Sequence, residues 1–155
     1  MKREFAVLRA LLLLAAVGCW RPALAQVAIS EPWVRGTVEG QTSTVAYMKF
    51  KSDIGARLVS VTSPMAARVG VHEMTMDGNL MRMRAVDALQ VPAGGTLALE
   101  EGHQHLMLEG LKRSLRPGDT VPLTLRFVDA RGATQTVEVQ ASVRALGASS
   151  SAPAN

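Results

Sequence analysis

The stretch VPLTLRFVDARGATQTVEVQASV, residues 121–143, carries the pattern that decides the fold. Apolar side chains occupy every second position of residues 121–127 and again of residues 137–143. Strict alternation of apolar and polar residues is typical of β-strands that bury one face. The stretch therefore predicts two half-buried strands.

Similar short runs recur along the rest of the chain, separated by turn signals such as Asp77-Gly78 and Pro117-Gly118-Asp119. These runs cover residues 45–51, 58–62, 69–74, 80–85, 96–100 and 104–109. No window has the sustained 3.6-residue period of an amphipathic helix. Eight or nine short strands with no helices between them predict an all-β fold, an antiparallel sandwich or barrel.

The first 25 residues have the features of a secretory signal peptide. A basic start is followed by an apolar run at residues 10–17 and by the small-x-small cleavage site Ala23-Leu24-Ala25. The apolar run is too short to span a bilayer, and no later segment approaches the roughly 18 apolar residues that a spanning helix needs. A second route of export stays open, because residues 16–19 (AVGC) loosely resemble a lipobox with Cys19 as the lipidated residue.

These features divide the chain into three parts. We predict a signal peptide at residues 1–25, a metal-binding β-domain at residues 26–145 and a disordered tail at residues 146–155. The tail, LGASSSAPAN, is small, polar and low in complexity, so it has little apolar surface to bury.

Removal of the signal peptide changes both the charge and the cysteine content. The 17 basic residues fall to 13 and the 13 acidic residues fall to 12, so the net charge drops from +4 to about +1. Nucleic-acid binding requires a basic face, which this balance does not support. Cys19 lies in the removed segment, so the exported domain has no disulfide, no thiolate nucleophile and no thiolate metal ligand.

All three histidines fall in one window with five of the seven methionines that follow the signal peptide. The window contains His72, Met74, Met76, Met81, Met83, His103, His105 and Met107. Asp77-Gly78 is a favoured two-residue hairpin turn, and with those residues as the loop His72 would face Met83 across the hairpin. The histidine and methionines of the hairpin would then share one face of the sheet.

The later strand is expected to present its histidine and methionine in the same way. His105 and Met107 alternate with Leu106 and Leu108. If the leucines face the core, the histidines and methionines of both segments face outward. Exposed thioethers leave apolar surface in water, so packing explains such a stripe poorly.

A bound metal explains the stripe better than packing does. Thioether and imidazole together suit the soft cation Cu(I), whereas Mg²⁺ and Ca²⁺ take oxygen ligands and structural zinc usually takes thiolate and imidazole. Two imidazoles and two thioethers carry no charge, which favours moderate, exchangeable binding over a thiolate trap. The pattern predicts a Cu(I) site made of imidazole and thioether ligands.

Ten residues separate His72 from Met83, twenty-one separate Met83 from His105, and one separates His105 from Met107. This spacing is similar to the HX10MX21HXM signature of the periplasmic copper chaperones called PCuAC. The segments VHEMTMDGNLMRMR, VPAGGTLALEEGHQHLMLEGLK and GDTVPLTLRF also resemble that family, and the resemblance extends over residues 33–143. It implies a cupredoxin-like Greek-key β-barrel that binds Cu(I) at its surface.

The resemblance also implies ligands and partners. The ligands would be His72, Met83, His105 and Met107. The protein would deliver copper during assembly of the copper centres of cytochrome c oxidase, and its apo acceptor would be an oxidase subunit or a Sco-type thiol protein. His103 is an addition that the signature does not require.

Several residues near the signature keep two open roles. Met74, Met76 and Met81 could form an apolar rim or docking surface, or could capture copper. His103 could be a supporting or alternative ligand, or a solvated loop residue. The aromatic residues are assigned to core or edge packing; they are Trp33, Tyr47 and Phe50.

Other classes of function fit the sequence less well. It has no Ser-His-Asp spacing, no paired catalytic carboxylates and no Gly-rich phosphate loop, so we predict that the protein is not an enzyme. A blue-copper electron carrier needs a cysteine ligand, and a β-sandwich adhesion module would leave the cluster unexplained. The prediction is a monomeric periplasmic copper chaperone, with a passive copper buffer or scavenger as the alternative.

Overall fold

The computed structural model describes residues 27–148, and every regular element in that range is a strand. The strands are β1 (Ala28–Arg35), β2 (Ser43–Ser52), β3 (Ala56–Thr62), β4 (Ala66–Asp77), β5 (Leu80–Val86), β6 (Leu89–Val91), β7 (Gly95–Ala98), β8 (His105–Leu111), β9 (Thr120–Asp129) and β10 (Thr134–Arg144). No helix within residues 27–148 has the length and apolar character that a bilayer crossing would demand. The predicted signal peptide and residues 149–155 of the predicted tail lie outside the described range.

Seven of the strands close into a barrel in the order β4, β8, β2, β1, β10, β9 and β3. Closure comes from pairing of β3 with β4 at Val61 and Val69. β5, β6 and β7 extend the barrel at β4, β3 and β2. Only the pair β1 and β10 is parallel among these strands, so the predicted all-β, largely antiparallel barrel is confirmed.

The alternating side chains of the strands fill the barrel. On β9 the residues Val121, Leu123, Leu125 and Phe127 are all buried, and Phe127 meets Phe50 of β2 edge-on with ring centroids 5.4 Å apart. On β8 the inward residues are Leu106 and Leu108, both fully buried. Burial of this apolar surface is the main force that stabilises the fold.

Two strands were absent from the sequence prediction, β1 and β6. In β1 the register shifts between Ser30 and Trp33, and Glu31 between them has a φ of 53°. A bulge of this kind adds a residue to the strand and interrupts its alternation, so the sequence pattern is lost. β6 has three residues, which is too short to show any period.

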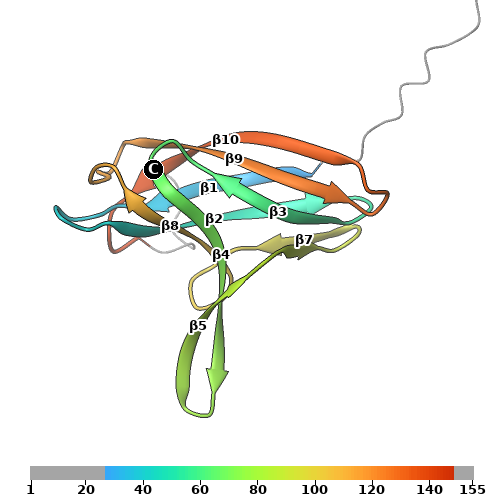
Figure 1. The fold of residues 1–155 in the computed structure, drawn as a ribbon, viewed down its shortest axis with the longest axis horizontal. Coiled ribbons are helices and arrows are strands. Elements are labelled where there is room, and N and C mark those ends of the chain that lie inside the picture. The colour runs from blue at the N-terminus through green and yellow to red at the C-terminus, as the bar shows by residue number, and fades with distance from the viewer. Residues whose placement is uncertain (1–26, 149–155) are drawn as a thin grey trace, which may run out of the picture.

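The β4–β5 hairpin projects away from the body of the barrel (Figure 1). Its loop is Gly78-Asn79, because Asp77 pairs with Leu80 and Gly78 takes a φ of 63°. The predicted loop, Asp77-Gly78, is therefore wrong by one residue. Each residue of β4 therefore pairs with a β5 residue two positions later than predicted, and a shift of two leaves every side chain on its predicted face.

Candidate metal centre

Two histidines of the predicted set lie directly opposite each other on neighbouring strands. His72 of β4 pairs with His105 of β8, and one step along the same face Gly70 pairs with Met107. The two imidazole rings are nearly parallel, with an interplanar angle of 20° and centroids 6.1 Å apart. The register therefore brings His72, His105 and Met107 together on the outer face of the sheet.

Met83 approaches the same point from β5, although by a different register from the one predicted. Its direct partner is Met74, and His72 faces Ala85 rather than Met83. Met83 is thus a diagonal neighbour of His72, at the roughly 7–8 Å typical of such pairs. A methionine side chain with three rotatable bonds can cover that separation.

The four residues of this cluster differ in how far their side chains are exposed to solvent. His105 is only 4% exposed, His72 and Met107 are half-buried, and Met83 is 49% exposed. The prediction that both histidines face solvent is wrong for His105. Its side chain lies on the outer face, but neighbours on that face cover it.

The cover over His105 comes from β2 and from the loop before β8. The Tyr47 ring lies 6.4 Å from the His105 ring, centroid to centroid. Arg35 binds both the Tyr47 hydroxyl and the carboxylate of Glu101 in that loop. The carbonyl of His103 lies 3.2 Å from His105 Nδ1, and it also accepts the backbone N–H of Met74 at 3.3 Å.

The hydrogen bond to His103 assigns the two nitrogens of His105 to different roles. Nδ1 donates to the carbonyl, so the neutral ring presents the lone pair of Nε2. Nε2 is buried and has no partner in the protein, and the same holds for Nδ1 of His72. Buried nitrogens without a partner are rare, and a pair of them on facing strands beside two thioethers fits a soft metal ion.

The surroundings of His105 favour the neutral form of its imidazole. Burial lowers the pKa of His105 below the ordinary histidine value, against the raising effect of its hydrogen bond to the His103 carbonyl. Positive charge on His72 and on Arg35 lowers that pKa further. A neutral imidazole is the form that binds a metal, so His105 stays competent at lower pH than an ordinary histidine.

Gly70 makes room for the second histidine. A Cβ added there would lie 3.6 Å from Cε1 and 4.0 Å from Nδ1 of His72, so the imidazole folds back over the glycine toward Met107. A larger side chain would occupy the space between His72 and Met107. Sequence analysis missed Gly70, although a glycine inside a strand pattern is itself a signal of close approach.

The aromatic residues Trp33 and Tyr47 continue the row of rings that His72 and His105 begin. The ring centroids of Trp33 and Tyr47 are 4.7 Å apart, and the guanidinium of Arg144 lies 5.0 Å from the Trp33 ring. Both rings are buried on the outer face, outside the barrel core in which Phe50 lies. Their packing supports His105 from the side opposite His72.

The remaining residues of the predicted cluster lie at the edge of this site. Met74 is half-buried beside the loop that carries His103, and the His103 side chain is exposed. Met76 and Met81 lie farther along the hairpin and are 64% and 58% exposed. These three methionines share the outer face with Met83.

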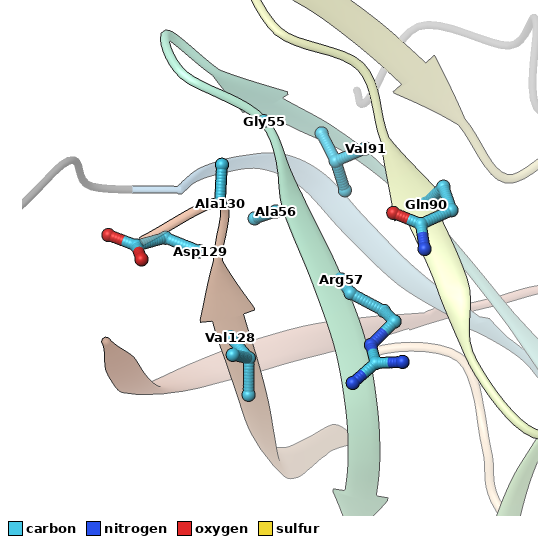
Figure 2. A pocket seen from close by; sticks show the side chains of 8 residues that line it. All are labelled: Gly55, Ala56, Arg57, Gln90, Val91, Val128, Asp129 and Ala130. Carbon is cyan, nitrogen blue, oxygen red and sulfur yellow. The ribbon is translucent and has the colours of Figure 1, made fainter. Parts of the chain in front are cut away.

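Outside this site, residues 27–148 form no cluster of the usual metal-binding side chains. No group of three or more His, Cys, Asp or Glu side chains that could hold a metal occurs in that range. A pocket between β3, β6 and β9 has Asp129 among its lining residues (Figure 2). The Asp129 carboxylate accepts the backbone N–H groups of Arg131 and Ala133 in its own turn. That pocket has no histidine and no hydroxyl nucleophile among its lining residues.

Comparison with known proteins gives relatives over most of the chain. Residues 27–141 match the family described as "Putative lipoprotein LpqE-like". The "Putative lipoprotein Lxx21020" of Leifsonia xyli subsp. xyli is 36% identical over 141 residues, which are 84% of this chain and 84% of that protein.

Solved structures with the same fold include copper-loaded proteins. The Cu(I) form of DR1885 from Deinococcus radiodurans is 34% identical, with a TM-score of 0.60 over 84% of this chain and 85% of that one. The copper-bound PCuAC domain from PmoF2 is 25% identical, with a TM-score of 0.64 over 79% of this chain and 96% of that one. The predicted cupredoxin-like fold is thus confirmed, and the chain belongs to the LpqE-like family and has the fold of a PCuAC domain.

Proposed function

We propose that this protein is a copper chaperone that binds Cu(I) through His72, Met83, His105 and Met107 and delivers it to an acceptor. One observation carries the proposal. Two buried imidazole nitrogens, His105 Nε2 and His72 Nδ1, lie on facing strands without a protein partner, and thioethers flank them. The copper-bound structures of similar proteins support copper as the ion.

The chemistry of these ligands suits a carrier. All four ligands are neutral, so the site does not hold Cu(I) by charge, and the thioethers favour the soft monovalent ion. Met83 is the most exposed of the four, at 49%. An acceptor ligand can therefore replace Met83 first and His105 last, and copper passes on without a free-ion stage.

The acceptor and the compartment follow from the family resemblance. We propose delivery in the periplasm, during assembly of the copper centres of cytochrome c oxidase, to an oxidase subunit or a Sco-type thiol protein. The protein would act as a monomer and would catalyse no reaction. Two modes of export remain, cleavage after Ala25 and lipidation at Cys19, and the lipoprotein names of the relatives favour the second.

Direct transfer distinguishes this chaperone from a passive copper buffer. Copper-loaded protein is mixed with a candidate apo acceptor, and in a parallel cell a dialysis membrane separates the two. A chaperone should deliver copper at least about ten times faster in the mixture, because ligand exchange avoids release of the free ion. Equal rates in the two cells would support the buffer and contradict delivery.

The affinity for Cu(I) should depend on pH only below neutral pH. A protonated imidazole cannot bind the metal, whereas a thioether has no proton to lose. Cu(I) affinity should therefore be nearly flat above pH 7 and fall below the ordinary histidine pKa of roughly 6.5. Because the pKa of His105 is lowered, proton competition at that ligand should begin only at more acidic pH.

Competition titrations with a chromophoric Cu(I) chelator between pH 5 and pH 8.5 measure this dependence. Each imidazole that must lose a proton contributes up to about tenfold per pH unit. A steep rise in affinity that continues above pH 8 would identify a ligand other than histidine and thioether.

A further inference from the structure

The outer half of the β4–β5 hairpin carries four methionines, of which the proposed His72–His105 site uses only Met83. Met76 pairs directly with Met81, and Met74 pairs directly with Met83. Direct partners in an antiparallel pair have Cβ atoms about 4.5–5.5 Å apart, and successive residues of one face are about 7 Å apart along the strand. Four thioethers therefore occupy one small area of a single face.

The two faces of this hairpin differ in chemistry. On the opposite face Glu73 forms an ion pair with Arg84, with N–O distance 2.6 Å, and Asp77 forms one with Arg82, with N–O distance 2.9 Å. The carboxylates are thus engaged with arginines, away from the methionines. The thioether face carries no charged side chain, so hard cations such as Ca²⁺ and Mg²⁺ find no oxygen ligand on it.

Packing does not account for these methionines. Met76 is 64% exposed and Met81 is 58% exposed, and the hairpin projects from the barrel with no other strand lying over it (Figure 1). Exposed thioethers are apolar surface left in water, and apart from Leu80 the opposite face of the outer hairpin carries only charged or hydroxyl side chains. A methionine side chain has three rotatable bonds, so the exposed Met76 and Met81 can turn toward a common centre.

We propose that Met74, Met76 and Met81 form a second Cu(I) site, made of thioethers alone, at the outer end of the hairpin. Three neutral, soft sulfur ligands select a monovalent soft ion. The site holds Cu(I) more weakly than His72 and His105 do, because it lacks imidazole. Met83 lies beside Met74 and diagonally from His72, so it can exchange between the two sites.

This arrangement makes the hairpin an entry point for copper. Cu(I) first binds the exposed thioethers. It then moves inward as His72, Met83, His105 and Met107 replace Met74, Met76 and Met81, with no change of oxidation state. The inward step rests on the proposed function of the histidine site. Binding at the tip does not, since it needs only the three methionines.

The test is a titration of the full exported domain labelled with ¹³C at the methionine methyl groups. Ag(I), a redox-inert soft ion, is added in two successive equivalents, and Cu(I) is then added anaerobically in a parallel sample. The first equivalent should shift the methyl resonances of Met83 and Met107. The second should shift those of Met74, Met76 and Met81, so that wild type binds two ions.

Variants separate the two sites. Combined Met74→Leu, Met76→Leu and Met81→Leu substitution keeps the apolar surface and removes the sulfur atoms, and it should reduce binding from two ions to one without changing the first affinity. The control Leu80→Ala, on the charged face of the same hairpin, should still bind two. His72→Ala should weaken the first equivalent and leave the tip site able to bind.

Two results would overturn the tip site. One is wild-type binding of a single ion, with the methyl resonances of Met74, Met76 and Met81 unmoved by the second equivalent. The other is an unchanged stoichiometry in the triple leucine variant, even if copper delivery became slower, which would make the three methionines a docking surface. Failure of His72→Ala to affect the first equivalent would instead refute the histidine site and leave the tip site standing.

Discussion

Alanine at both Met83 and Met107 should lower the affinity of the protein for its first Cu(I) by at least about a hundredfold. Loss of a single supporting contact around a metal typically costs 10–100-fold in affinity, and this double variant removes two ligands outright. His72 and His105 remain as a two-nitrogen site, which is less selective for a soft ion. Competition against a Cu(I) chelator measures the change.

The same variant should keep its fold, because neither thioether lies in the barrel core. Met83 is 49% exposed and Met107 lies half-buried on the outer face. Met65→Ala, at a methionine outside the site, is the matched control and should bind Cu(I) like wild type. An unchanged affinity in the Met83→Ala, Met107→Ala variant would remove both thioethers from the ligand set.

Alanine at His105 should destabilise the apo protein by about 2 kcal/mol, whereas alanine at His72 should cost less than about 1 kcal/mol. His105 is 4% exposed, packs beside Tyr47 and holds the His103 carbonyl through Nδ1. His72 is half-buried, and its Nδ1 makes no hydrogen bond. Removal of the half-buried His72 side chain therefore leaves no large cavity.

Thermal or urea unfolding of both variants in the presence of a Cu(I) chelator provides the measurement. Wild-type apo protein should unfold cooperatively in the same buffer, since the barrel core contains none of the proposed ligands. If His72→Ala abolished folding, His72 would be essential to the barrel core, which would contradict its place on the outer face of the sheet. If His105→Ala had no effect, the cover over His105 would contribute nothing to stability.

Strong alternation made most of the barrel predictable. Residues 121–127 and 137–143 show a period of two because one face of β9 and β10 packs inside the barrel. The strand β1 could not be predicted in this way, since the bulge at Glu31 moves the later residues to the other phase. Local pattern also carries no information on which strands meet, so the parallel pair β1 and β10 was not foreseen.

For the candidate site, the sequence predicted which side chains share a face but not which residues pair or how deeply His105 is buried. The face on which each proposed ligand lies depends only on even or odd spacing, so an error of one residue in the hairpin loop left the shared face correct. The pairing of Met83 with Met74 depends on where the turn begins, which Gly78 decides through its positive φ. Burial of His105 depends on Tyr47 and on the loop with Glu101, which are distant in sequence.

X-ray absorption at the copper edge of the protein loaded with one equivalent of Cu(I) tests the central claim most directly. The bound ion should have a shell of two sulfur and two nitrogen atoms, from Met83, Met107, His72 and His105. In the His72→Ala variant one nitrogen should be lost while both sulfurs remain. A first shell made only of nitrogen and oxygen, or one unchanged in that variant, would contradict the assignment.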